Sequence, residues 1–189
     1  MMSEQAPGMW TAEGLLEAYV FESVAEPASI AQVKEQLAGT PGVAFVAQFV
    51  GHFSVFARVT AESLSQLQGR IDGDYRQAGI RSDWSLNLTA ESRAAPKRAS
   101  PDLCALVCAR TETDPFEIQL ALDSVFLQPG EGAAVINHAD FDLLVDLGAD
   151  TIDDLVKRVK LLRTQQGIGR TATSFADLGD NAIRPGTPS

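Results

Sequence analysis

Cysteine, basic residues and long apolar runs are all scarce in this chain of 189 residues. The two cysteines, Cys104 and Cys108, are four positions apart, which is not the spacing of a C-x-x-C redox or zinc motif. On a strand they would lie about 13 Å apart along one face, beyond the reach of a disulfide. We therefore expect two buried, inert thiols.

The charge balance excludes another class of partner. The chain has 15 basic and 25 acidic residues, a formal charge of −10, and such a field repels nucleic-acid phosphates. The longest apolar runs, such as 43–50, are far shorter than the roughly 20 residues that span a bilayer. The first residues lack the basic region and the apolar stretch of a secretory signal. These absences predict a cytoplasmic protein with no nucleic-acid or membrane partner.

Familiar catalytic signatures are also missing. The chain has no G-x-S-x-G, Walker loop, Rossmann fingerprint or H-E-x-x-H motif. His138, Asp140 and Asp142 could present metal ligands, but no fourth ligand follows at a recognisable spacing. We therefore expect no catalytic residue, no metal and no cofactor.

What the sequence does contain is an internal repeat. A shift of 88 positions places Ile30 on Ile118, Pro41-Gly42 on Pro129-Gly130, Phe53 on Phe141 and Gly79-Ile80 on Gly167-Ile168. These matches fall at turns and at apolar positions, where chance would not place them together. The sequence therefore predicts two domains, 15–91 and 101–179, joined by a polar linker at 92–100. Residues 1–14 and 180–189 are expected to be tails.

Each copy has the pattern strand, helix, strand, strand, helix, strand. In the first copy these elements are expected at 16–24, 29–37, 43–50, 54–59, 63–77 and 83–89. In the second copy they are expected at 103–109, from 114 to before Pro129, and at 133–137, 142–147, 151–165 and 170–176. This order predicts an α+β fold of two tandem ferredoxin-like βαββαβ units. Asp153–Lys157 and Asp154–Arg158 should pair on the last helix.

Both faces of the predicted sheet are apolar. Phe45, Ala47 and Phe49 point to the side opposite Val46 and Val50. Helices on one side can cover only one of these faces. We therefore expect the two copies to pack sheet on sheet, as an internal pseudo-dimer of the dimeric α/β-barrel type.

Several of these segments resemble the effector-binding (RAM) domain of the Lrp/AsnC regulators. They are GTPGVAFV at 39–46, the hairpins GHFS at 51–54 and ADFD at 139–142, and the Gly-Ile pairs after the second helices. The resemblance implies a domain that oligomerises and binds an amino acid near the hairpin. It places the ligand at Gly51, His52, Phe53 and Ser54 and at His138, Asp140, Phe141 and Asp142.

Each hairpin departs from the family pattern in a different way. Ser54 stands where the family has Asp, and Ala139 stands where it has Gly. Either one half-site is lost, or a composite site uses Gly51 from one copy and Asp142 from the other. Only 14 residues precede the first strand, so we expect no helix-turn-helix.

These features give two hypotheses of different classes. The first is a stand-alone, non-catalytic tandem module that binds a small effector such as an amino acid. It would associate with itself or with a full-length regulator of the family. The alternative is a dimeric α/β-barrel monooxygenase or heme-linked enzyme, for which His52, Trp84 and His138 would be the candidate residues.

Overall fold

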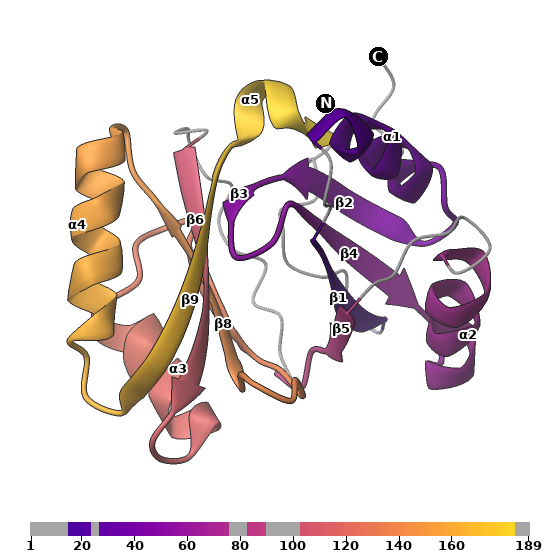
Figure 1. The fold of residues 1–189 in the computed structure, drawn as a ribbon. Coiled ribbons are helices and arrows are strands. Elements are labelled where there is room, and N and C mark those ends of the chain that lie inside the picture. Colours follow the sequence, from indigo (N-terminus) through magenta and orange to yellow (C-terminus); the bar gives the residue numbers. More distant parts are fainter. Residues whose placement is uncertain (1–14, 24–26, 76–82, 90–102, 184–189) are drawn as a thin grey trace, which may run out of the picture.

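The computed structural model describes residues 15–23, 27–75, 83–89 and 103–183, and these form two halves of the same design (Figure 1). The predicted tail at 1–14 and the predicted linker at 92–100 lie outside the described residues. The first half contains β1 (Leu16–Glu22), α1 (Pro27–Ala38), β2 (Val43–Gln48), β3 (Val50–Gly51), β4 (Val55–Ala61), α2 (Leu64–Gly69), the π-helical turn η1 (Arg70–Tyr75) and β5 (Asp83–Leu86). The second contains β6 (Leu103–Thr111), α3 (Pro115–Val125), β7 (Gly132–Val135), β8 (Leu143–Gly148), α4 (Ile152–Arg163), β9 (Ile168–Asp177), α5 (Leu178–Asn181) and β10 (Ala182–Ile183).

The strand order confirms the predicted fold class. The four main strands of the first half are ordered β2-β4-β1-β5, and those of the second half β7-β8-β6-β9. All of the pairings are antiparallel. Both orders place the first and third strands of a unit in the middle of its sheet, as the ferredoxin-like unit requires.

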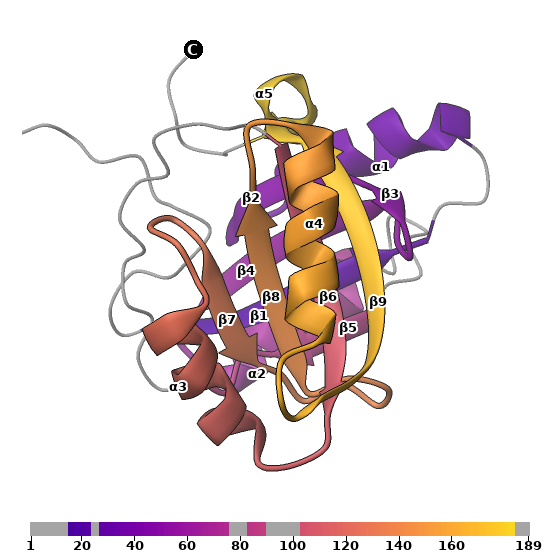
Figure 2. The ribbon, with the colours of Figure 1, turned by 90° about the vertical axis from the view of Figure 1, so that its left-hand side faces the viewer.

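The two sheets pack face to face with the helices outside. Figures 1 and 2 show α1 and α2 on one outer side and α3 and α4 on the other. Two apolar clusters lie under the helices, and a third lies between the sheets. Phe45, Ala47 and Phe49 belong to the cluster between the sheets, whereas Val46 belongs to the helix side. The predicted sheet-on-sheet packing is therefore correct.

The edges of the two sheets also meet. β10, which follows β9, pairs with β2 of the first half, and β3 pairs with β9 of the second half. On the other side Asn87, just after β5, forms a bridge with Ile136, just after β7. These contacts close the sheets into a barrel. They are not among the contacts expected from the sequence, and β10 lies within 180–189, the segment expected to be a tail.

Local chemistry explains where the helices begin and turns occur. The side chains of Ser63, Asp114 and Thr151 accept hydrogen bonds from backbone amides in the first turns of α2, α3 and α4. Gly42 and Gly130 precede β2 and β7 with φ of 84° and 89°, a conformation that glycine adopts at low cost. No described helix is long and apolar enough to cross a membrane.

Neither of the two ion pairs predicted on α4 forms, although both basic residues have acidic partners. Lys157 pairs with Asp154, at 2.9 Å between Nζ and Oδ1, rather than with Asp153. Arg158 instead binds Glu131, a buried carboxylate at the start of the second sheet. Glu131 also accepts the backbone amides of Gln128 and Gly148. A buried carboxylate attracts the nearby guanidinium more strongly than an exposed aspartate on the same helix does.

Equivalent positions of the two halves can be read from the strand register. Phe21 pairs with Phe56, and Cys108 pairs with Leu144. Phe56 and Leu144 are 88 positions apart, but Phe21 and Cys108 are 87 apart, so the first strand is offset by one residue.

The 88-residue shift makes Arg58 and Asp146 equivalent, and both are buried, at 2% and 3% exposure. The fully buried hydroxyl of Tyr19 lies near both: its pKa is raised by burial and by the carboxylates of Glu17 and Asp146, and Arg58 opposes this.

Candidate functional site

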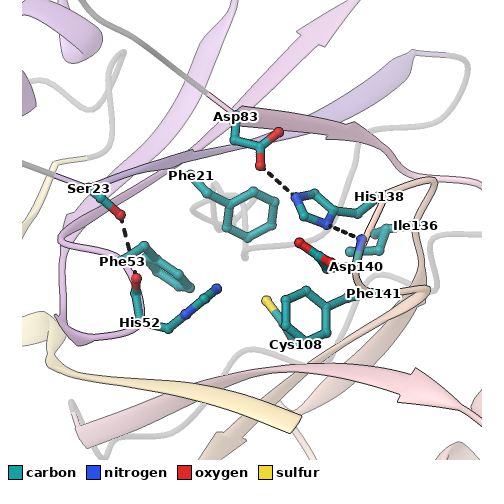
Figure 3. Close-up of a pocket in the computed structure, with 10 residues that line it drawn as sticks. All are labelled: Phe21, Ser23, His52, Phe53, Asp83, Cys108, Ile136, His138, Asp140 and Phe141. Atoms are coloured by element: carbon teal, nitrogen blue, oxygen red, sulfur yellow. Dashed lines mark hydrogen bonds and ion pairs between the residues drawn. The ribbon is translucent and has the colours of Figure 1, made fainter. Parts of the chain in front are cut away.

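A cavity of about 270 Å³ lies at the end of the inter-sheet core where the two hairpins meet (Figure 3). Its walls come from both halves. The lining residues are Phe21, Ser23, His52, Phe53, Asp83, Cys108, Ile136, His138, Asp140 and Phe141. Apolar walls with a few convergent polar groups are typical of small-molecule sites.

Equivalent residues of the two halves face this cavity in pairs. Phe53 and Phe141 are one such pair, and both are buried in the core between the sheets. Phe21 and Cys108 are another. His52 corresponds to Asp140, so the two hairpins present an imidazole on one side and a carboxylate on the other. The cavity is therefore a single composite site with two chemically different sides.

His138 is held in a fixed orientation by both halves. Its Nε2 lies 2.7 Å from Oδ2 of Asp83, a residue of the first half. Its Nδ1 is 3.1 Å from the backbone nitrogen of Asp140, which donates a hydrogen bond to it. These two contacts assign the proton of the neutral ring to Nε2. The side chain of His138 is 11% exposed, and its ring stacks on Phe141 with centroids 5.7 Å apart.

His52 is held through its backbone, which leaves its ring available. Its amide donates to the carbonyl of Thr173 at 3.3 Å, and its carbonyl accepts the hydroxyl of Ser23 at 3.5 Å. The imidazole contacts Phe141 edge-on, with centroids 5.7 Å apart. In the described part of the chain, no side chain or backbone group forms a hydrogen bond to its ring nitrogens. Figure 3 shows the ring pointing into the cavity, across from His138.

Five of the eight predicted ligand residues line the cavity, and three do not. Gly51 has a φ of 143° and packs on β9, where an added Cβ would lie 2.4 Å from the carbonyl oxygen of Thr173. The backbone amide of Ser54 donates to the carbonyl of Glu22 at 2.7 Å. Asp142 accepts the amide of Thr111 at 2.8 Å, and its Oδ2 lies 3.7 Å from Nε of Arg110. These contacts fix the hairpins, and neither Gly51 nor Asp142 lines the cavity.

Five further lining residues were not among the predicted ligands: Phe21, Ser23, Asp83, Cys108 and Ile136. Asp83 lies on β5, where alternation with Trp84 could have indicated that the two side chains point to opposite faces. Trp84, which the alternative hypothesis named, instead packs against the helix-side cluster of the first half. Only the closure of the barrel brings Asp83 to His138, and no sequence spacing encodes that contact.

The cysteine prediction is confirmed as far as burial and pairing are concerned. Cys104 and Cys108 are free and buried between the sheets. Burial raises the pKa of the Cys108 thiol to about 12. Its sulfur therefore contributes to the cavity wall as an apolar surface. Within the described ranges, no three His, Cys, Asp or Glu side chains are placed to hold a metal ion.

Comparison with known proteins shows a similarity in fold and in nothing else. No protein-family model matches the chain, and no curated protein sequence is similar to it. Two structures of the siroheme decarboxylase NirDL, one with an iron-uroporphyrin III analogue, share the fold with TM-scores of 0.63 and 0.61. They have 8% and 9% identity and cover 89% of this chain, and this chain covers 74% and 73% of theirs.

Two further structures extend the likeness. A mutant chlorite dismutase from Candidatus Nitrospira defluvii, in complex with cyanide, has a TM-score of 0.51 and 15% identity over 89% of this chain and 93% of its own. A protein inferred to be a monooxygenase from Lactobacillus acidophilus has a TM-score of 0.50 and 9% identity over 92% of this chain and 98% of its own.

These likenesses contradict the Lrp/AsnC interpretation. The structures that share the fold are those of enzymes, so the interpretation as a non-catalytic amino-acid sensor of transcription regulation is wrong. The physical reason lies in what the matched motifs do. Gly42 makes the turn before β2, and Phe53 and Phe141 fill the core between the sheets. Such residues specify the ferredoxin-like fold, which hosts many activities.

Proposed function

We propose that this chain is an acid–base enzyme that removes a proton from a small, planar ring compound held in the cavity between the hairpins. One observation carries the proposal: His52 and the Asp83–His138 pair converge on a single cavity walled by Phe21, Phe53 and Phe141. Imidazole is the most frequent acid–base group in enzymes, and aromatic walls favour a flat ligand.

The two histidines have different roles in this proposal. The ring nitrogens of His52 are available, so this residue accepts the substrate proton. His138 is already engaged through both nitrogens, so its ring is a fixed part of the wall, and the carboxylate of Asp83 beside it is the acceptor that orients the substrate ring. A carboxylate that holds an imidazole in one tautomer is a familiar arrangement in proton-transfer sites.

A tetrapyrrole, which one of the similar structures holds as an analogue, fits this cavity poorly. The cavity volume of about 270 Å³ lies just below the range of roughly 300–1,000 Å³ for drug-sized ligands. One substituted ring fills this space, whereas a tetrapyrrole joins four rings in one plane. The similarity of fold therefore supports the enzyme class and does not extend to the porphyrin.

The proposal is tested with a panel of planar ring compounds that carry an acidic C–H or O–H group. Deuterium incorporation in D₂O, followed by NMR, reports proton removal, and an oxygen electrode reports any coupled oxygen uptake. We expect turnover of at least one compound, lowered about 10²- to 10⁴-fold in His52→Gln. Glu35→Gln, on the exposed surface of α1, is the matched control and should leave the rate unchanged.

A hemin titration tests the competing interpretation, a heme-linked enzyme. A sharp histidine-ligated absorption spectrum at one equivalent of hemin, lost in His52→Gln, would contradict the proposal and favour a heme-linked enzyme. Equal exchange rates in the wild type and in His52→Gln would also contradict it. Because the chain has only two histidines, their imidazole proton signals can be assigned with a single variant.

A further inference from the structure

The electrical asymmetry of the cavity indicates the charge of the ligand. Its ten lining residues include the carboxylates of Asp83 and Asp140 but no lysine or arginine. Both carboxylates lie on the side of His138, whereas His52 and Ser23 lie on the other side (Figure 3). We infer that the ring compound carries a positive charge, as an ammonium, an amidinium or a protonated N-heterocycle, which binds at the Asp83–Asp140 side. This inference rests on the proposed function for the presence of a ring ligand.

Both carboxylates are accessible to such a group. Oδ2 of Asp83 contacts Nε2 of His138, and a carboxylate has a second oxygen that can accept a further hydrogen bond. The side chains of Asp83 and Asp140 are 67% and 63% exposed, which leaves them accessible to an entering ligand. Phe21 and Phe53 meet edge-on with centroids 5.3 Å apart and supply aromatic surface beside them. A cation is attracted both by a carboxylate and by the face of an aromatic ring.

The rim already holds a planar cation of this chain. The guanidinium of Arg170 lies 5.3 Å above the centroid of Phe141, and its Nη2 is 3.9 Å from Oδ1 of Asp140. These contacts, one with a carboxylate and one with a phenyl ring, are of the kind that an amidinium ligand would make inside the cavity. Arg170 is 69% exposed, so its side chain can turn away when a ligand enters.

The charge also fixes the orientation of the ligand. His52 and Asp140 are equivalent positions of the two halves, so a chain with two identical copies would present the same group on both sides. Here a positive end is attracted to the side of Asp140 and Asp83. A donor group at the opposite end of the same ring then faces the available nitrogens of His52. The charged end and the proton to be removed are therefore expected at opposite ends of the ligand.

Benzamidine, benzamide and benzoate test this inference, because they share ring and shape and differ mainly in charge. Isothermal titration at fixed ionic strength should show benzamidine binding at least tenfold more tightly than benzamide, with benzoate weakest. Asp140→Asn and Asp83→Asn should each weaken benzamidine binding about tenfold, and Arg170→Gln should strengthen it. Glu35→Gln removes one negative charge far from the cavity, so it controls for the overall charge of −10.

The outcomes separate this inference from the proposed function. Equal binding of benzamidine and benzamide, tighter binding of benzoate, or no binding of benzamidine would each overturn the inference about charge. An equal loss of affinity in Glu35→Gln and Asp140→Asn would overturn it as well, because the attraction would then be that of the whole molecule. The deuterium-exchange assay tests proton removal independently, so a cation-binding cavity without turnover refutes only the proposed function.

Discussion

The packing of the two sheets can be tested by removing one ring from the core between them. Phe56 is fully buried, and its ring lies 5.6 to 6.3 Å from those of Tyr19, Phe21, Phe45, Phe49 and Phe53. Replacing a buried phenylalanine by alanine costs about 3–5 kcal/mol in transfer and cavity terms. Because the ring also contacts five other aromatic rings, the loss should lie in the upper part of that range. We therefore expect Phe56→Ala to lower the free energy of unfolding by about 4–5 kcal/mol.

Urea denaturation followed by tryptophan fluorescence measures this loss. For a chain of this length the same change lowers Tm by roughly 8–20 °C, at about 2–4 °C per kcal/mol. Phe116→Ala is the matched control, because Phe116 lies on α3 and is 43% exposed; it should cost less than about 1 kcal/mol. If Phe56→Ala lost under about 2 kcal/mol, or no more than Phe116→Ala, the two sheets would not depend on this core. Phe21 and Phe53, which line the cavity, rest on Phe56, so ligand binding should weaken as well.

Two further predictions concern buried titratable groups. Burial raises the pKa of Glu22 from 4.5 to about 7, so the folded state favours its neutral form. The resulting stability is fully present below pH 4.5 and is lost as the pH rises through about 7. Glu22→Gln should remove this pH dependence. If the urea midpoints of the wild type and of the variant changed with pH in the same way across that range, the reasoning would be refuted. For Cys108, whose pKa is about 12, we expect no alkylation by iodoacetamide in the native protein at pH 7.5 and rapid alkylation in urea; native-state labelling detected by mass spectrometry would contradict the burial of this thiol.

The fold followed from the sequence because each of its main strands and helices has a local signal. The apolar alternation of β2 and the helical spacing of α4 result from burial on one face, and both are visible in a single copy. The repeat then indicates the same order of strands and helices in both copies. β3 and β10 were missed because strands of two residues carry no periodicity. The predicted helix at 63–77 is interrupted after Gly69 by a π-helical turn, which the apolar spacing does not reveal.

The site was only partly predictable for a different reason. Turn chemistry located both hairpins, and His52, Phe53, His138, Asp140 and Phe141 do line the cavity. Asp83 and Phe21 reach the same cavity from other strands through the packing of one sheet on the other. The family assignment failed because Pro-Gly turns and buried hairpin phenylalanines report backbone geometry, which proteins of different activity share.

The equivalence of Arg58 and Asp146 has a consequence for how this molecule can change. In a dimer of identical chains every substitution occurs twice, so a buried arginine at this position would face its own copy. Joining the copies in one chain removes that constraint, and opposite charges can occupy equivalent places. The same freedom applies to the hairpins, where His52 could be altered while Asp140 is kept. A protein engineer could therefore tune one wall of the cavity without disturbing the other.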